Sequence, residues 1–504
     1  MSLSSASSDS SFKNWVFNDR PNRMLLLISA AVILIEWIIF KRLFPFPNFI
    51  PESTNYIDCA LNNKSISVWP IAYSKFLRVF NTFVSSDTGL VTFQYLFLQG
   101  SIIYFLLSIS WLLKLPRPAI IVLFILNLLN PILLHLANYV SSDAIFVGLS
   151  LIWFTQMLWL IRRLTLATLC LHAIVLFLAF SLRFFAIYYP VVSIILLLLL
   201  HTKPKVKIIG AAVIIIPLVL YVIHETREYQ VETKTTQFSA FGGWQLSANA
   251  LYAYAHSPLD SPALAPPPFR ALHALVNRHM IELSHLQHRP DQQINIYYQW
   301  DDQAPLKRYM YQYWLHDSTT DNFTKYAVMG KLYSGYGAWL IRRHPFNYVL
   351  YFGLPNSVDY YAPEPEFMGA YNMGFDSVAP VIANWFGWRS RKVENAFKTN
   401  TIHLAGAYTI IVPVINLIFI FTLLVVLFSK GYMDGIPLLK PLLRITLVLW
   451  AVNMLFSVFS AWIILRYAIF PLIMTVSFAI VCISFLIREF QFENTFKKQT
   501  ILYE

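Results

Sequence analysis

Four charged side chains stand beside or within long apolar stretches, where an isolated charge is costly. Asp58 lies between two apolar residues soon after the first apolar run, and Asp143 follows two serines at the start of another. Arg183 and Arg466 each interrupt an otherwise apolar stretch. A carboxylate in such a place could act as a general base toward a hydroxyl group. A guanidinium group could bind a phosphate through paired hydrogen bonds.

Each of these side chains also has a structural explanation. The sequence Ser-Ser-Asp ending at Asp143 is a good start signal for a helix, and Asp58 could cap a helix or lie in a solvated loop. An arginine at a membrane boundary can extend its side chain toward lipid headgroups. Two arginines on the same outer face nevertheless favour a phosphate-bearing lipid as ligand.

The elements that must position these side chains are membrane-spanning helices. Of the 504 residues, 57% are hydrophobic and only 13% are charged, whereas a soluble domain is about 25% charged. This composition excludes a soluble enzyme, a disordered scaffold and a secreted disulfide domain. A span needs about 20 apolar residues, and ten runs are candidates: 24–40, 89–113, 119–137, 142–161, 164–182, 184–200, 208–224, 401–428, 445–465 and 467–487.

The distribution of lysine and arginine predicts the orientation of these spans. Both tails and the alternate connections carry 16 lysines and arginines, whereas the short connections on the other side hold only Arg183 and Arg466. The two long segments on that other side are exempt from the charge rule. Both termini are therefore predicted to face the cytoplasm. The net charge of +12 is explained by this asymmetry and by attraction to anionic headgroups, and it does not indicate nucleic-acid binding.

We therefore predict an all-α polytopic membrane protein with about ten spans. An amphipathic stretch from Ile71 to Val84 predicts a helix in the outer interface, although an ordinary surface helix would show the same pattern. The late outer segment is expected to be mostly helical. The predicted parts are a cytoplasmic tail (1–23), an N-terminal transmembrane module (24–224) with a first outer loop (41–88), an extracytoplasmic segment (225–400), C-terminal transmembrane helices (401–487) and a second cytoplasmic tail (488–504).

The order of these features resembles the GT-C class of integral-membrane glycosyltransferases. That class includes protein O-mannosyltransferases and the aminoarabinose transferase of lipid A. The similarity in topology covers nearly the whole chain, and the local matches are Pro51–Ala60, Ser142–Phe146, Leu182–Pro190, Arg343–Phe352 and Arg466–Pro471.

This resemblance implies transfer of a sugar from a polyprenyl-phosphate donor to an acceptor hydroxyl, on the extracytoplasmic face and with inversion. By position, Asp58 would be the base that deprotonates the acceptor, and Asp143 would orient the acceptor or assist. Arg466 and the adjacent Tyr467 would bind the donor phosphate, with Arg183 as a second phosphate contact.

The sequence departs from the class in its first outer loop, where many members pair two carboxylates. Here Glu52 and Asp58 are six positions apart and would not share one face of a helix, so Glu52 is kept as the reserve acid. Some members of the class need a divalent metal and others do not, and this sequence does not decide between them. It shows no metal-ligand spacing that would identify a site.

The implied partners are the lipid-linked donor, membrane lipids and an acceptor that is a lipid, a glycan or a protein. The implied location is the bacterial inner membrane, or the endoplasmic reticulum membrane in a eukaryote. Two alternatives remain: a polysaccharide polymerase or ligase that uses lipid-diphosphate glycans, and a lipid or solute transporter. The enzyme hypothesis requires Asp58 and Arg466 to face a common cavity, and their separation would favour a carrier.

Overall fold

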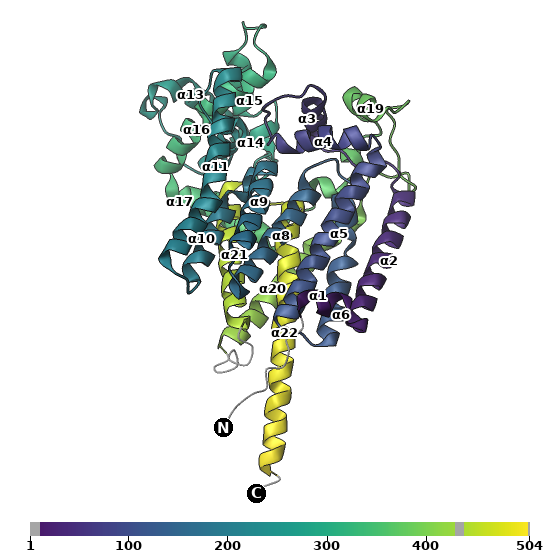
Figure 1. Ribbon diagram of the computed structural model, residues 1–504. Coiled ribbons are helices and arrows are strands. Elements are labelled where there is room, and N and C mark those ends of the chain that lie inside the picture. The colour runs from purple at the N-terminus through teal and green to yellow at the C-terminus, as the bar shows by residue number, and fades with distance from the viewer. Residues whose placement is uncertain (1–10, 429–437, 502–504) are drawn as a thin grey trace.

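The protein is built from helices that form a bundle and a cap. The computed structural model describes residues 11–428 and 438–501, with side chains up to Phe490. Within these ranges the chain forms helices, and extended segments meet only at isolated β-bridges. The bundle lies below and the cap above in Figure 1.

Seven helices in the described ranges are long and apolar enough to cross a membrane. They are α2 (Arg20–Leu43), α5 (Asp87–Leu112), α8 (Asp143–Arg162), α11 (Pro204–Thr233), α20 (His403–Phe428), α21 (Leu439–Ser460) and α22 (Leu465–Ile501), the last through its apolar part Leu465–Phe490. The chain is therefore an all-α, polytopic membrane protein, as the composition predicts.

The other three predicted spans are broken or short. Run 119–137 forms α6 (Arg117–Leu128) and α7 (Pro131–Ala137), which are bent by 43° and count as an eighth span only when taken together. The bend occurs where proline begins α7, since proline cannot donate the backbone hydrogen bond that would continue α6. Runs 164–182 and 184–200 form the shorter α9 (Leu166–Leu182) and α10 (Tyr189–Leu199), the latter preceded by the 3₁₀ turn η1 (Phe184–Tyr188).

Two helices of the segment predicted to be the first outer loop, α3 (Pro51–Leu61) and α4 (Ala72–Phe83), lie across the upper end of the bundle (Figure 1). The predicted amphipathic helix is present as α4. Its buried residues include Tyr73 and Leu77, whereas Val79 and Phe83 are exposed. An exposed apolar face is what a helix in contact with lipid would show. The position of α4 in the membrane interface itself stays a prediction.

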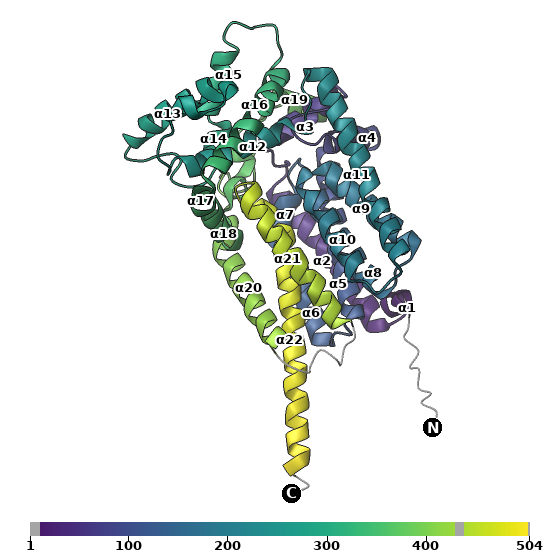
Figure 2. The same ribbon diagram turned by 90° about the vertical axis from the view of Figure 1, so that its left-hand side faces the viewer.

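The segment 225–400 is mostly helical, as predicted, and its larger helices form the cap (Figure 2). Its elements include α12 (Ala240–Tyr254), α13 (Arg270–Ser284), α14 (Tyr297–Trp300), α15 (Pro305–Tyr313), α16 (Asn322–Arg343), α17 (Pro345–Tyr348), α18 (Leu354–Tyr361) and α19 (Pro380–Phe386). The boundary expected at 224/225 falls inside α11, which continues from the bundle to Thr233.

The cap is centred on the contact between α12 and α16. These helices approach closely because glycines face each other: a Cβ atom on Gly243 would lie only 1.8 Å from the Gly330 carbonyl oxygen. Next to this contact, Trp244 is fully buried and stacks on Tyr326 with 4.7 Å between ring centres. The close backbone contact and the buried aromatic rings together hold α12 and α16 in a fixed relative position.

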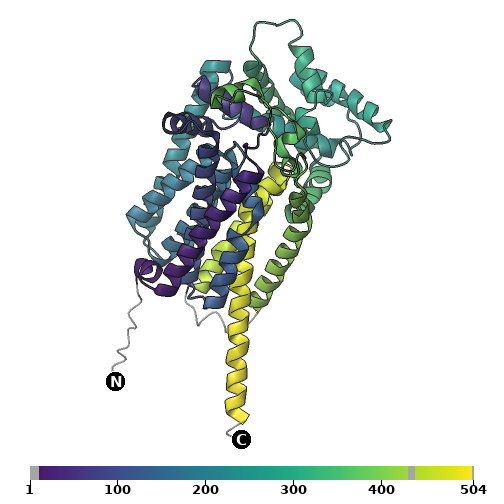
Figure 3. The same cartoon turned by 90° about the vertical axis from the view of Figure 1, so that its right-hand side faces the viewer.

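Both ends of the described chain lie opposite the cap. The short α1 (Phe12–Phe17) packs at the lower end of the bundle, and the C-terminal part of α22 projects from the same end (Figure 3). Thus α22 continues through much of the predicted tail 488–504, while the first ten residues of the predicted tail 1–23 lie outside the described ranges. This placement agrees with the prediction that both termini share one side.

Candidate functional site

Four charged side chains from four distant segments meet between the bundle and the cap. The Arg466 guanidinium is 3% exposed and contacts two carboxylates. Its Nη2 lies 2.9 Å from Glu52 Oε1, and its Nη1 lies 3.4 Å from Asp143 Oδ2. Arg183 forms an ion pair with the other oxygen of Asp143. The two arginines are therefore joined through one buried carboxylate.

Helix ends place all four side chains at one level. Glu52 is in the first turn of α3, which begins at a proline, and Asp143 is the first residue of α8. Both carboxylates are thus near helix N-termini, whose partial positive charge favours an anion. Arg183 directly follows the end of α9, and Arg466 is the second residue of α22.

Asp143 is held by further hydrogen bonds. The Ser141 hydroxyl donates to Asp143 Oδ2 at 2.7 Å, and the Asp143 side chain is 2% exposed. The Ser-Ser-Asp sequence does begin a helix, but Ser142 at the N-cap makes no side-chain cap hydrogen bond, so the cluster contacts of Asp143 are separate from helix capping. A buried carboxylate paired with two guanidinium groups is well suited to fix their positions.

The cluster lies in the wall of a cavity of about 630 Å³. Glu52, Asp143, Arg183, Arg466 and Tyr467 all line this cavity. The rest of the lining is rich in aromatic side chains, namely Tyr56, Trp69, Phe184, Phe185, Phe238, Phe241, Trp300, Phe367, Phe456, Phe459 and Trp462. One side of the cavity is thus charged, and most of the remaining wall is apolar.

The two arginines differ in how freely they face this cavity. The Arg183 side chain is 20% exposed, and its guanidinium carbon lies 4.7 Å from the centre of the Tyr467 ring. Arg466 is almost fully buried, and its Nη2 donates to the Tyr467 hydroxyl at 2.8 Å. Arg183 is consequently the more accessible cation, whereas Arg466 is buried and pairs with Glu52 and Asp143.

Two polar atoms in the cluster are buried without a hydrogen bond, Glu52 Oε2 and Arg466 Nε. Burial raises the pKa of Glu52, but the nearby Arg466 charge and hydrogen bond outweigh it, and the pKa falls below the ordinary glutamate value. Glu52 is therefore ionised at neutral pH. It has one carboxylate oxygen free to accept a proton or a hydrogen bond.

A third acid, Glu366, lies near the cluster and is absent from the predicted site. Both of its carboxyl oxygens are buried without a hydrogen bond. Burial raises its pKa to about 8; the Arg466 charge opposes this shift and the Glu52 charge adds to it. Glu366 is therefore protonated at neutral pH. No local pattern marks it in the sequence, because its burial comes from the packing of residues far apart in the chain.

Asp58 lies outside the cavity. It is on α3 six residues after Glu52, a separation that turns its side chain well away from the face that carries Glu52. Asp58 instead forms an ion pair with Lys64 at 2.8 Å, and its side chain is 39% exposed. The structure therefore does not bring Asp58 to Arg466. This is the separation that counts against the enzyme hypothesis with Asp58 as base. The hypothesis stands only with the reserve acid Glu52 as base, because Glu52 shares the cavity with Arg466.

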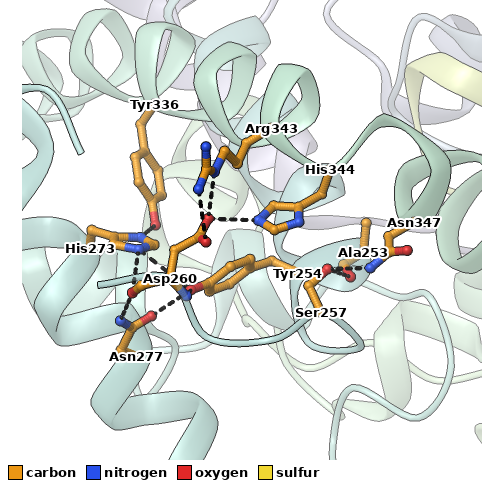
Figure 4. Close-up of polar contacts among 10 residues, drawn as sticks. All are labelled: Ala253, Tyr254, Ser257, Asp260, His273, Asn277, Tyr336, Arg343, His344 and Asn347. Carbon is orange, nitrogen blue, oxygen red and sulfur yellow. Dashed lines mark hydrogen bonds and ion pairs between the residues drawn. The ribbon is translucent and has the colours of Figure 1, made fainter. Parts of the chain in front are cut away.

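The sequence match at Arg343–Phe352 also lies away from the cavity. Arg343 and His344 both bind Asp260, at 3.1 Å and 2.9 Å (Figure 4). Burial raises the pKa of Asp260, but these two partners together lower it below the usual value. These contacts join the end of α16 to the loop that follows α12, so this cluster holds the cap together.

The described side chains contain no metal centre. In residues 11–428 and 438–490, no group of three or more His, Cys, Asp or Glu side chains is arranged to hold a metal ion. No step of the chemistry below is assigned to a metal.

Comparison with known proteins gives one distant likeness. No family model matches the chain, and no curated protein matches it. A solved structure, that of ArnT from Cupriavidus metallidurans bound to undecaprenyl phosphate, matches with a TM-score of 0.33 and 11% identity, over 91% of this chain and 78% of that one. A likeness this distant carries over neither a site nor an activity.

Proposed function

We propose that the protein is a membrane glycosyltransferase that moves a sugar from a polyprenyl-phosphate donor to an acceptor hydroxyl at the outer face. One observation carries the proposal: two arginines and two carboxylates meet in the wall of an aromatic cavity at the upper end of the helix bundle. Transfer of the sugar from phosphate to a hydroxyl needs an ionised acid to accept the proton and fixed cations to bind the phosphate. Extended isoprenoid chains suit the apolar part of the wall.

In this reaction the bond between the sugar C1 and the phosphate oxygen breaks, and a bond between C1 and the acceptor oxygen forms. The electron pair of the broken bond stays on the phosphate, which gains negative charge as it leaves. Fixed cations stabilise that charge more in the transition state than in the ground state. The acceptor hydroxyl loses its proton to a carboxylate. Attack from the side opposite the phosphate inverts the configuration at C1.

The roles follow from exposure and pairing. Arg183 is the accessible phosphate contact, and Arg466 with Tyr467 supports the phosphate from the buried side. Glu52 is the proposed base, since it is ionised and has a free oxygen. Asp143 is a positioning residue, because both of its oxygens are paired with arginines.

The base is tested by comparing Glu52→Gln with Asp58→Asn in purified protein, using a panel of polyprenyl-phosphate sugars. The measurement is release of polyprenyl phosphate, with membrane extract as the source of acceptor. We expect Glu52→Gln to lose about 10²–10⁴-fold in rate, and Asp58→Asn to keep near-normal activity. The reverse result would return the base to Asp58. A wild-type protein that binds the lipids but breaks no glycosidic bond would indicate a carrier.

A further inference from the structure

A second cavity, of about 780 Å³, adjoins the first. Val68, Trp69 and Trp300 line both cavities, so they form a shared wall. Within this wall the two indole rings stack, with centres 5.9 Å apart and planes inclined by 15°. The second cavity lies on the cap side of this wall, bounded mainly by the loop before α4 and by α15 and α16.

The two cavities have different linings. The first is dominated by phenylalanine away from its charged cluster. The second contains no phenylalanine other than Phe323 and is lined by amides, lysines, hydroxyl groups and tryptophans, together with the carboxylates Glu232 and Asp321 and a few aliphatic side chains. An isoprenoid chain would gain little from such a surface. A sugar suits it, because pyranose C–H groups pack against aromatic rings and the hydroxyls need polar partners.

Polar atoms around the second cavity lack partners. The Tyr326 hydroxyl and the Trp314 indole nitrogen are buried without a hydrogen bond of standard geometry. Both residues line the second cavity, and Tyr326 is only 6% exposed. Gln299, on the first-cavity side, is 1% exposed, and its side chain interacts with the Tyr326 hydroxyl outside standard hydrogen-bond geometry. Buried polar groups without partners are costly, and a hydroxyl-rich ligand would satisfy them.

A cation is held at the same wall. Lys307 Nζ lies 5.4 Å from the ring centres of both Trp244 and Trp300. Asp302 acts on Lys307 electrostatically. The cavity lining also holds other charges: Lys325 donates to the Asp317 carbonyl oxygen, Asp321 accepts from the first amides of α16, and Glu232 is a further carboxylate. Lys307 is the cation that lies against Trp300 of the shared wall, and it favours an acidic group placed there.

We propose that the second cavity binds the acceptor and that this acceptor is a carbohydrate, preferentially an acidic one. This proposal rests on the proposed function and adds the class of acceptor. A glycan in the second cavity places its end at the Trp69–Trp300 wall, beside the cavity that contains Glu52. Transfer then requires this end to pass the wall of Val68, Trp69 and Trp300 and reach Glu52, which takes the proton of its hydroxyl as the new bond to C1 forms.

The test uses purified full-length protein and two soluble probes, tetragalacturonic acid and chitotetraose, with calorimetric measurement of binding. Wild type should bind both and prefer the acidic probe. Tyr326→Phe removes one hydroxyl and should weaken both probes by about 3–10-fold. Lys307→Met should abolish the preference for the acidic probe. Undecaprenyl phosphate binding should be unchanged in both variants.

The outcomes separate this proposal from the proposed function. If neither probe binds at about 10 mM, or if both variants bind as wild type does, the carbohydrate assignment is overturned while lipid-phosphate binding still stands. If the probes bind as expected but Arg183→Gln leaves undecaprenyl phosphate binding unchanged, the donor site is wrong and the glycan site stands. Loss of lipid binding in Tyr326→Phe would show a general defect in folding and would count against a separate glycan site.

Discussion

At the scale of single residues, the site pairs every cation with an acid. Arg183 and Arg466 are matched by Asp143 and Glu52, so the cluster is close to neutral before an anionic lipid arrives. An added phosphate must therefore compete with a carboxylate for a guanidinium group. The partly exposed Arg183 is the position at which this exchange costs least, because water already reaches it.

Arg183→Gln tests this exchange directly. Loss of a charge-assisted phosphate contact should weaken undecaprenyl phosphate binding by about 10-fold or more. The matched control is Arg343→Gln, which removes the same charge from the Asp260 cluster in the cap, away from the cavity. Equal weakening in both variants, measured with the same lipid in detergent, would show that only overall charge matters.

Glu366 gives a prediction about pH. Its folded pKa of about 8 lies above the ordinary value near 4.5, so folding favours the protonated form. The stabilisation is complete below pH 4.5 and is lost as pH rises through 8. The free energy of unfolding should fall by about 1.4 kcal/mol per pH unit between these values and then level off. In Glu366→Gln this contribution to the slope should disappear, as measured by thermal unfolding across pH 5–9. An identical slope in both proteins would refute the assignment.

At the scale of elements, the glycine contact between α12 and α16 sets the shape of the cap. Gly243→Ala would force a Cβ atom against the Gly330 carbonyl, and backbone cannot move aside as a flexible side chain can. We expect a loss of about 1–3 kcal/mol or more in stability, seen as a lower melting temperature and faster proteolysis of the cap.

Gly242 supplies the control for this substitution. It is the preceding residue of the same helix, and a Cβ atom there would meet nothing within 4 Å. Gly242→Ala should be neutral or stabilise the helix by about 0.5–1 kcal/mol. If both alanine variants behaved alike, close approach of the two helices would not be what holds the cap.

Element positions could be predicted well from the sequence, and the choice between nearby acids could not. The length of the apolar runs located the spanning helices, because a helix needs about 20 apolar residues to cross a bilayer. The amphipathic spacing of residues located α4. The helical offset between Glu52 and Asp58 showed that only one could face the site. Which one depends on how α3 turns against α8 and α22, through contacts between residues 86 and 414 positions apart in the chain. Local patterns contain no information about that rotation.

At the scale of the whole molecule, the cap is predicted to lie outside the cytoplasm and the lower end of the bundle inside it. This orientation can be tested because each end of the molecule has exposed residues. Ser261→Cys in the cap should react with an impermeant maleimide added outside intact cells or vesicles. Lys203→Cys, at the lower end of the bundle before α11, should react only after permeabilisation. Both positions are exposed in the folded chain, so a lack of reaction reflects the side of the membrane. The opposite pattern would invert the topology and move the proposed reaction to the cytoplasm.

The helix α11 has a mechanical consequence. Its 30 residues span about 45 Å, which exceeds the roughly 30 Å thickness of bilayer hydrocarbon, and its upper end continues into the cap. A rod anchored in both places converts a change in bilayer thickness into tilt. The cap above the cavity that contains Glu52 should therefore shift when short-chain phospholipids replace long-chain ones. The rate of turnover should then depend on acyl-chain length even when the lipid headgroups are identical.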